Sequence, residues 1–211
     1  MSLFHSDAFL AFRSRDFSLL SVNQLCLILT IMIQEVVIAY SIYQLTQNPL
    51  SLGMIALIEL LPFICLSLIS GDWADRYNRQ KIVQWSFSCS TLIPLLFIVL
   101  FSQYQQQHIQ QNTLLCGIYS LIFCLGILRG IYSPSFNSLR PFLTPESAYS
   151  NAATWTALIW QMGGILAPLC AGLLLSQLGL EKTLFIVFLL CCMGSICLFG
   201  LSPRDFPSPH K

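Results

Sequence analysis

Charged side chains are scarce in this chain of 211 residues, because Asp, Glu, Lys and Arg together make up only 9% of it. An average soluble domain carries about 25% charged residues. Hydrophobic residues make up 55% of the chain and its mean hydropathy is +0.71, so the apolar character extends over the whole sequence. This composition excludes an ordinary soluble globular protein and predicts a membrane protein with several spans.

Motifs for catalysis and nucleotide hydrolysis are also missing. The chain has no His-Glu-x-x-His motif, and no glycine-rich phosphate loop followed by Lys-Ser or Lys-Thr. All nine cysteines fall inside apolar segments, without Cys-x-x-Cys spacing or a nearby histidine, and they are expected to pack as small hydrophobic residues. We therefore expect no enzyme activity, no ATP-driven transport, no metal or other cofactor, and no nucleic-acid partner.

Six apolar segments fill most of the sequence, and about 20 apolar residues cross the hydrocarbon core of a bilayer as a helix. The predicted fold is an all-α membrane protein with six transmembrane helices. The expected spans are approximately residues 17–45, 49–70, 81–101, 113–133, 151–176 and 182–201. They form one domain at 17–201, between a cytoplasmic or interfacial lead-in at 1–16 and a cytoplasmic proline-rich tail at 202–211.

The few cations gather on one set of connections. Lys182 is the only cation on the opposite set, and Arg129 lies inside a span. The remaining cations are Arg13, Arg15, Arg76, Arg79, Lys81, Arg140, Arg204 and Lys211. Because cytoplasmic loops carry an excess of Lys and Arg, both termini are predicted to lie in the cytoplasm.

The connection between the second and third spans, from Gly71 to Lys81, carries five charges in eleven residues. It resembles motif A of the major facilitator superfamily, Gly-x-Leu-Ala-Asp-Arg-x-Gly-Arg-Lys. The matching residues are Gly71, Ala74, Asp75, Arg76 and Arg79, whereas Trp73, Asn78 and Gln80 depart from the pattern. The resemblance implies a gating role for Gly71, Asp75, Arg76 and Arg79, with Asp75 near the start of the third span. The alternative is that these charges only anchor the chain at the inner membrane surface.

A second motif lies in the fifth span, where small residues recur around a proline. The run resembles motif C of the superfamily, Gly-x-x-x-Gly-Pro-x-x-Gly-Gly, which is typical of its proton-antiporting exporters. Gly163, Ala167, Pro168 and Gly172 follow this pattern, with alanine replacing glycine at residues 167 and 171. Small residues allow helix backbones to approach closely, so general helix packing is the alternative interpretation.

The stretch from the fourth to the fifth span resembles the enterobactin-exporter-like branch of the superfamily. The residues that follow its pattern are Pro134, Leu139, Pro141, Leu143, Pro145, Glu146, Asn151 and Ala152. We expect Pro134, Pro141 and Pro145 to break up the inner connection between these spans. The resemblance implies the N-terminal half of a twelve-span fold, built from two inverted three-helix repeats, in a bacterial inner membrane.

Polar groups inside the spans are the candidates for proton coupling or for lining a cavity: Gln34, Glu35, Glu59 and Arg129. Charges at mid-membrane cost about 2.5–3.5 kcal/mol each on insertion scales, so they usually face a cavity or a partner. A polar stripe on the first span, formed by Asn23, Thr30, Gln34 and Ser41 with Gln24 and Glu35 beside it, predicts a wetted cavity or, alternatively, hydrogen bonds between helices.

Glu59 and Arg129 each permit two interpretations. Burial favours the protonated form of a carboxyl, so Glu59 is either a proton-titrating group or a protonated packing residue. Arg129 lies near the inner end of the fourth span, and motif B of the family places an arginine in that span and ties it to proton coupling. A long side chain so close to the interface can also extend simply to reach water.

Two functions remain open at the level of the sequence. The first is a secondary transporter that exports a small amphipathic, siderophore-like or drug-like solute against a proton flux. Its expected partners are that solute, protons, the lipid bilayer, and a second six-helix half or another copy of the chain. The alternative is a truncated, non-transporting remnant or membrane scaffold that keeps the half-fold.

Overall fold

The computed structural model describes residues 9–144 and 148–202, and of residues 74–76 it describes only the backbone. All regular secondary structure in these ranges is helical. The elements are η1 (Ala11–Arg13), α1 (Arg15–Thr46), α2 (Leu50–Arg76), α3 (Arg79–Ser90), α4 (Leu92–Gln105), α5 (Gln111–Leu143) and α6 (Tyr149–Phe199).

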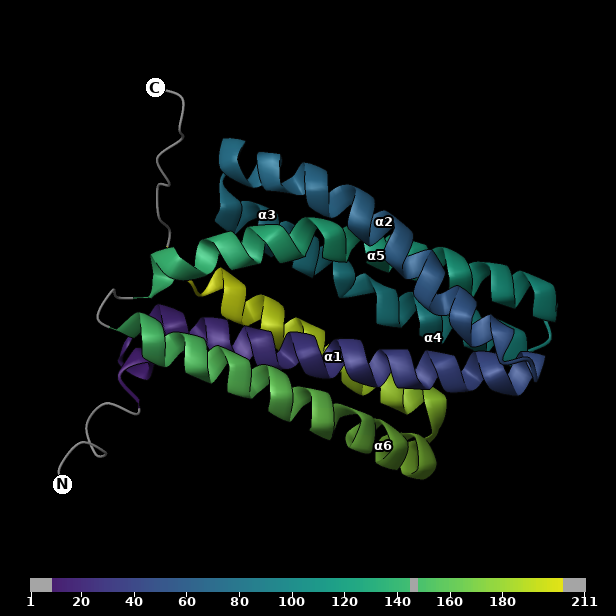
Figure 1. Cartoon of the computed structure of the whole chain (residues 1–211). Coiled ribbons are helices and arrows are strands. Elements are labelled where there is room, and N and C mark those ends of the chain that lie inside the picture. Colours follow the sequence, from purple (N-terminus) through teal and green to yellow (C-terminus); the bar gives the residue numbers. More distant parts are fainter. Residues whose placement is uncertain (1–8, 145–147, 203–211) are drawn as a thin grey trace.

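Five of the described helical stretches are long and apolar enough to cross a membrane, whereas the sequence predicts six spans. The difference lies in α6, whose 51 residues include the fifth and sixth predicted spans. Gly179 interrupts this element with φ 78° and ψ 178°, a conformation that is essentially confined to glycine. Figure 1 shows that α6 turns back there, so that residues 149–178 (the first arm) and 180–199 (the second arm) run antiparallel.

The helix α1 packs against both arms of α6, which makes it the central helix of one side of the bundle (Figure 1). A Cβ at Gly163 of the first arm would lie 2.5 Å from Cγ2 of Ile28. On the second arm, the carbonyl of Gly194 accepts a 3.1 Å hydrogen bond from Nδ2 of Asn23. The first arm therefore meets α1 through a glycine packed on a side chain, and the second arm meets it through a polar contact.

The helices α2 and α5 form the other side of the bundle, and they extend further than the sequence predicts. Pro134 and Pro141 lie inside α5, although we expected them to break up the connection after the fourth span. Pro145 lies outside the described residues. Similarly, α2 continues to Arg76, which places the backbone of Asp75 in the last turn of α2 and not near the start of α3. Hydropathy marks the edges of the apolar core, but these helices continue beyond it.

Side-chain caps fix two helix starts at one end of the bundle. The hydroxyl of Ser14 accepts from the amide of Phe17 at 3.5 Å and caps α1. The side chain of Asn78 accepts from the amide of Lys81 at 3.2 Å and caps α3. A side-chain oxygen at this position satisfies an amide that has no partner within the helix. The connection of motif A is therefore a short, capped turn between α2 and α3.

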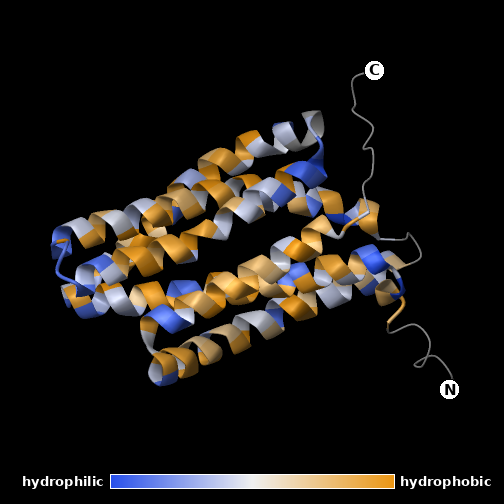
Figure 2. Ribbon diagram, turned by 180° about the vertical axis from the view of Figure 1, so that it is seen from behind, coloured by the Kyte–Doolittle hydropathy of each residue, from blue (hydrophilic) through white to orange (hydrophobic). Residues whose placement is uncertain are grey.

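The beginning of α1 and the end of α6 meet at the same end of the bundle. The carboxylate of Asp16 accepts hydrogen bonds from the amide and the hydroxyl of Ser202, at 3.2 and 3.0 Å. The α2–α3 connection lies at this end, and the α1–α2 and α4–α5 connections lie at the other (Figure 1). Hydrophobic residues cover the helix bodies, while hydrophilic residues gather at the connections (Figure 2).

Neighbouring glycines in the first arm of α6 give a matched test of this packing. We expect Gly163→Ala to destabilise the fold by about 1–3 kcal/mol, because overpacking a stiff, fully buried Ile28 forces a backbone shift. Gly164→Ala has open space around it and is the control. Thermal unfolding in detergent, followed by size-exclusion chromatography, measures both variants. An equal midpoint for the two variants would contradict the close contact with α1.

Candidate functional site

A close crossing of α2 and α5 positions the site. A Cβ at Gly126 would lie 2.4 Å from the backbone oxygen of Glu59 and 2.7 Å from Cγ of Pro62. One turn further, a Cβ at Gly130 would lie 3.0 Å from the carbonyl oxygen of Phe63. The hydroxyl of Ser70 also donates to the carbonyl of Gly130 at 2.7 Å. Only glycine allows the two backbones to approach this closely.

Glu59 and Arg129 form an ion pair at this crossing, between Oε1 of the carboxylate and Nη1 of the guanidinium. Their side chains remain 18% and 21% exposed, respectively. Because α5 continues to Leu143, Arg129 lies in the interior of the helix and not near its end as the sequence predicts. Its guanidinium contacts Glu59 on the neighbouring helix, so it does not simply extend to the interface.

All four polar candidates from the spans line one small space. Gln34, Glu35, Glu59 and Arg129 surround a cavity of about 20 Å³, together with the apolar side chains Ile38, Ile55, Phe97, Ile122 and Leu125. A cavity of about 10–15 Å³ already accommodates a water molecule. The structure therefore brings both carboxylates, the cation and the amide of this set to one position with room for water.

This space borders a larger hollow on the bundle surface. Glu35, Glu59 and Arg129 line it together with Ala56, Leu60 and Phe63, and its volume is about 320 Å³. Glu35 is exposed within the described chain. A second carboxylate thus faces the same hollow as the Glu59–Arg129 pair.

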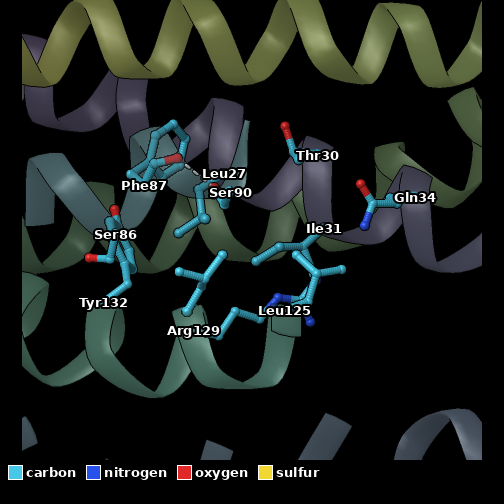
Figure 3. Close-up of a pocket in the computed structure, with 11 residues that line it drawn as sticks. Leu27, Thr30, Ile31, Gln34, Ser86, Phe87, Ser90, Leu125, Arg129 and Tyr132 are labelled. Carbon is cyan, nitrogen blue, oxygen red and sulfur yellow. Dashed lines mark hydrogen bonds between the residues drawn. The ribbon is translucent and has the colours of Figure 1, made fainter. Parts of the chain in front are cut away.

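A third space, of about 30 Å³, lies between α1, α3 and α5 (Figure 3). Thr30 and Gln34 line it from α1, Ser86 and Ser90 line it from α3, and Arg129 and Tyr132 belong to α5. It has room for one or two water molecules. Gln34 and Arg129 line both this space and the cavity beside Glu59, so polar groups connect α3 with the ion pair.

The polar residues of the α1 stripe are divided between hydrogen bonds and the lining of small cavities. Asn23 is fully buried and accepts a 2.8 Å hydrogen bond from the hydroxyl of Tyr132 while donating to Gly194, so it joins three helices. Thr30 contacts Sγ of Cys191 at 3.6 Å, and the hydroxyl of Ser41 donates to the carbonyl of Val37. Gln34 instead lines the small cavities.

The motif A residues lie at the end of the bundle where α1 begins. The Arg79 guanidinium carbon lies 5.2 Å from the ring centroid of Phe142, which connects the start of α3 to the end of α5. Gly71 lies in α2, and a Cβ there would have no heavy atom within 4 Å. The side chains of Asp75 and Arg76 are outside the described part of the structure.

The motif C run packs through only part of its residues. Gly163, Ala167 and Ala171 are buried at a spacing of four residues, on the face of the first arm that meets α1. Pro168 and Gly172 are exposed, and a Cβ at Gly172 would have no neighbour within 4 Å. The packing that we expected of Gly172 therefore belongs to Ala171, because Gly172 lies about 100° further around the helix.

Sequence reasoning missed the glycine pair that makes the ion pair possible. Gly126 and Gly130 stand four residues apart on either side of Arg129, a spacing known to allow close contact between membrane helices. Arg140 was likewise counted only among the loop cations, although it lies in the last turn of α5. The small-xxx-small spacing was a usable signal for the glycines.

Comparisons with known proteins give a consistent result. The family model described as Major Facilitator Superfamily matches residues 20–211. The chain is 24% identical over 169 residues to the uncharacterized MFS-type transporter YfiS of Bacillus subtilis, over 80% of this chain and 37% of that protein. It is 25% identical over 151 residues to the Staphyloferrin A transporter of Staphylococcus aureus, over 68% of this chain and 36% of that protein.

A third relative is the multi-drug resistance efflux pump PmrA of Streptococcus pneumoniae, 27% identical over 133 residues. That match covers 63% of this chain and 30% of the pump. The chain therefore spans about a third of the length of the curated relatives that it matches.

The ion pair can be tested by comparing the stability of the two single variants with that of the double variant. Removing one partner of a buried pair costs about 3–5 kcal/mol, because the other charge is left without a partner. We expect the lower part of this range for Glu59→Gln and Arg129→Gln, since both side chains keep some exposure. The double variant Glu59→Gln/Arg129→Gln should be more stable than either single variant by thermal unfolding. Additive losses in the double variant would show that the two groups are not coupled.

Proposed function

This chain belongs to the Major Facilitator Superfamily, and on that premise we propose that it forms half of a proton-coupled secondary transporter that exports a small amphipathic solute. Membership of this family and the names of the relatives support an integral membrane protein with a role in transport and not in catalysis. Two of these relatives carry the names Staphyloferrin A transporter and multi-drug resistance efflux pump. Siderophore-like and drug-like molecules are therefore the solute classes that we propose.

The observation that carries this proposal is the position of two carboxylates and one guanidinium around the same space. With Glu59 ionised, its carboxylate neutralises Arg129 across the α2–α5 crossing. A proton on Glu59 removes this attraction and frees the guanidinium for Glu35, which lines the same cavity and the same hollow. Proton binding and release at Glu59 would thereby change which group holds Arg129.

We propose that a second helical body covers the face that bears this hollow. Only 11% of the residues in the apolar window of α2 are buried within the chain, and three charged groups line the hollow beside it. A charge facing lipid at mid-membrane costs about 2.5–3.5 kcal/mol on insertion scales. A further six-helix half or another copy of the chain would remove this cost and complete a pathway that works by alternating access.

The proposed topology has six crossings, with the two arms of α6 as the fifth and sixth. Arg13, Arg15, Arg79 and Lys81 lie at the end where α1 begins, while Lys182 follows the bend at the other end. The positive-inside rule then places the end with motif A in the cytoplasm. Because the named relatives are bacterial proteins, we propose the cytoplasmic membrane of a bacterium as the location.

Dye transport in everted membrane vesicles tests proton coupling. We expect an imposed pH gradient, acidic inside, to drive accumulation of at least one of two probes, the cation ethidium or the anion fluorescein. Glu59→Gln should lower the gradient-driven rate at least tenfold, because an amide cannot bind and release the proton, and Glu35→Gln should also lower it. Exchange of the dye without a gradient should continue in the Glu59→Gln variant.

Glu181→Gln is the matched control, since it removes a carboxylate next to the α6 bend and outside the hollows described above. Wild-type gradient-driven rates in Glu59→Gln and Glu35→Gln would refute coupling through these carboxylates. A correctly inserted chain that moves neither dye would support a non-transporting scaffold instead.

A further inference from the structure

A separate cavity of about 300 Å³ lies next to the ion pair, and the described side chains that line it include two cations and no carboxylate. Its apolar wall consists of Leu27, Ile31, Phe63, Phe136 and Trp160. Its polar groups are Gln24, Arg129, Tyr132, Ser133, Asn137 and Arg140. Glu59 compensates Arg129, which leaves Arg140 as the cation that distinguishes this cavity.

Arg140 has few partners within the described residues. Its Nη2 donates to Oε1 of Gln24 at 3.2 Å, and its guanidinium carbon lies 5.1 Å from the ring centroid of Phe136. Its Nε is buried and has no hydrogen-bond partner in that part of the chain. A guanidinium carries five N–H donors, so most of them remain available to a ligand.

An alternative role for Arg140 is that of a cation anchoring the end of α5 at the membrane surface. Anchoring cations extend their charged groups toward water. Arg140 instead turns inward, where it contacts α1 and stacks on an aromatic ring. Its partner Gln24 is only 2% exposed and is itself held by a 3.1 Å hydrogen bond from Nε2 to the carbonyl of Thr156. The guanidinium is thus fixed by a buried residue at the edge of a cavity.

We propose that this cavity binds the anionic group of an amphipathic organic anion, with Arg140 as the charged contact. The proposal deepens the proposed function, on which it rests, by naming the charge of the solute. A carboxylate fits because a guanidinium can bind it through two parallel hydrogen bonds. Asn137 and Ser133 line the cavity on the same helix and can donate further hydrogen bonds.

The apolar side chains that line the rest of the cavity determine which uncharged part of a ligand fits. Trp160 and Phe63 face the cavity from the first arm of α6 and from α2, and Leu27 and Ile31 line it from α1. A volume of about 300 Å³ lies at the lower end of the range of small-molecule sites, about 300–1,000 Å³. An aromatic or short aliphatic carboxylate therefore matches both the size and the polarity of the site.

Calorimetric titration of the full chain in lipid nanodiscs tests the charge preference directly. The probes are 2-naphthoate, the neutral 2-naphthalenemethanol and the cation 2-naphthylmethylammonium, which share one aromatic body. We expect wild type to bind the anion at least about tenfold more tightly than the neutral probe, and the cation most weakly. Equal affinities for the three probes would overturn the proposal.

Substitutions in the cavity test whether Arg140 causes the preference for the anionic probe. Arg140→Gln should bind the anion and the neutral probe equally, and its retained affinity for the neutral probe shows that the cavity is intact. Asn137→Asp places a carboxylate beside Arg140 with almost no change in shape, and it should also remove the preference. Lys182→Gln also removes one positive charge, but next to the α6 bend and outside the residues that line the cavity. This variant should keep the preference for the anion. An unchanged preference in both Arg140→Gln and Asn137→Asp would refute the site.

The binding measurement needs no proton gradient, so it separates the two proposals. Anion preference that depends on Arg140, in a chain without gradient-driven transport, would refute only the proton-coupled function. Gradient-driven transport by a chain without that preference would refute only the anion site.

Discussion

Close contact between α2 and α5 is the constraint on which the charged centre depends. An ion pair within an apolar bundle is stable only when the two groups meet with good geometry, since each ion loses its hydration. Gly126 and Gly130 remove the side chains that would hold the helices apart, and the backbone of Glu59 therefore lies directly against α5. The arginine between these glycines meets the carboxylate as a direct consequence of this approach.

On the other side of the bundle, α1 distributes its polar residues between structure and candidate function. Asn23 connects the helix to Tyr132 and to the second arm of α6, and it is fully buried. Gln24 holds Arg140 at the edge of a cavity, whereas Gln34 and Glu35 line the space beside the ion pair. The membrane interior makes each unsatisfied polar group costly, so nearly every polar residue on this helix must contact a partner, water or a cavity.

Composition and motif spacing were sufficient to predict an all-helical membrane protein of the correct superfamily. The helix ends were harder to predict from the sequence. Pro134 and Pro141 are accommodated inside α5, and α2 continues beyond its apolar stretch to Arg76. The pairing of Glu59 with Arg129 was also beyond sequence reasoning. It depends on which helices are neighbours, and hydropathy carries no information about neighbours. The glycine spacing around Arg129 indicated a close contact but could not identify α2 as the partner.

The two kinds of helix contact differ in how they respond to force. Where a glycine packs directly on its neighbour, as Gly126 does on the backbone of Glu59 and Gly163 on the side chain of Ile28, sliding would require atoms to pass through one another's volume. The helix pairs α2–α5 and α1–α6 therefore behave as two stiff blocks. Between the blocks, the contacts from Arg140 to Gln24 and from Tyr132 to Asn23 are side-chain hydrogen bonds, which can break and re-form without a change in the backbone. The side chains between the blocks can therefore shift around an incoming molecule, while the glycine contacts keep the charged crossing in shape.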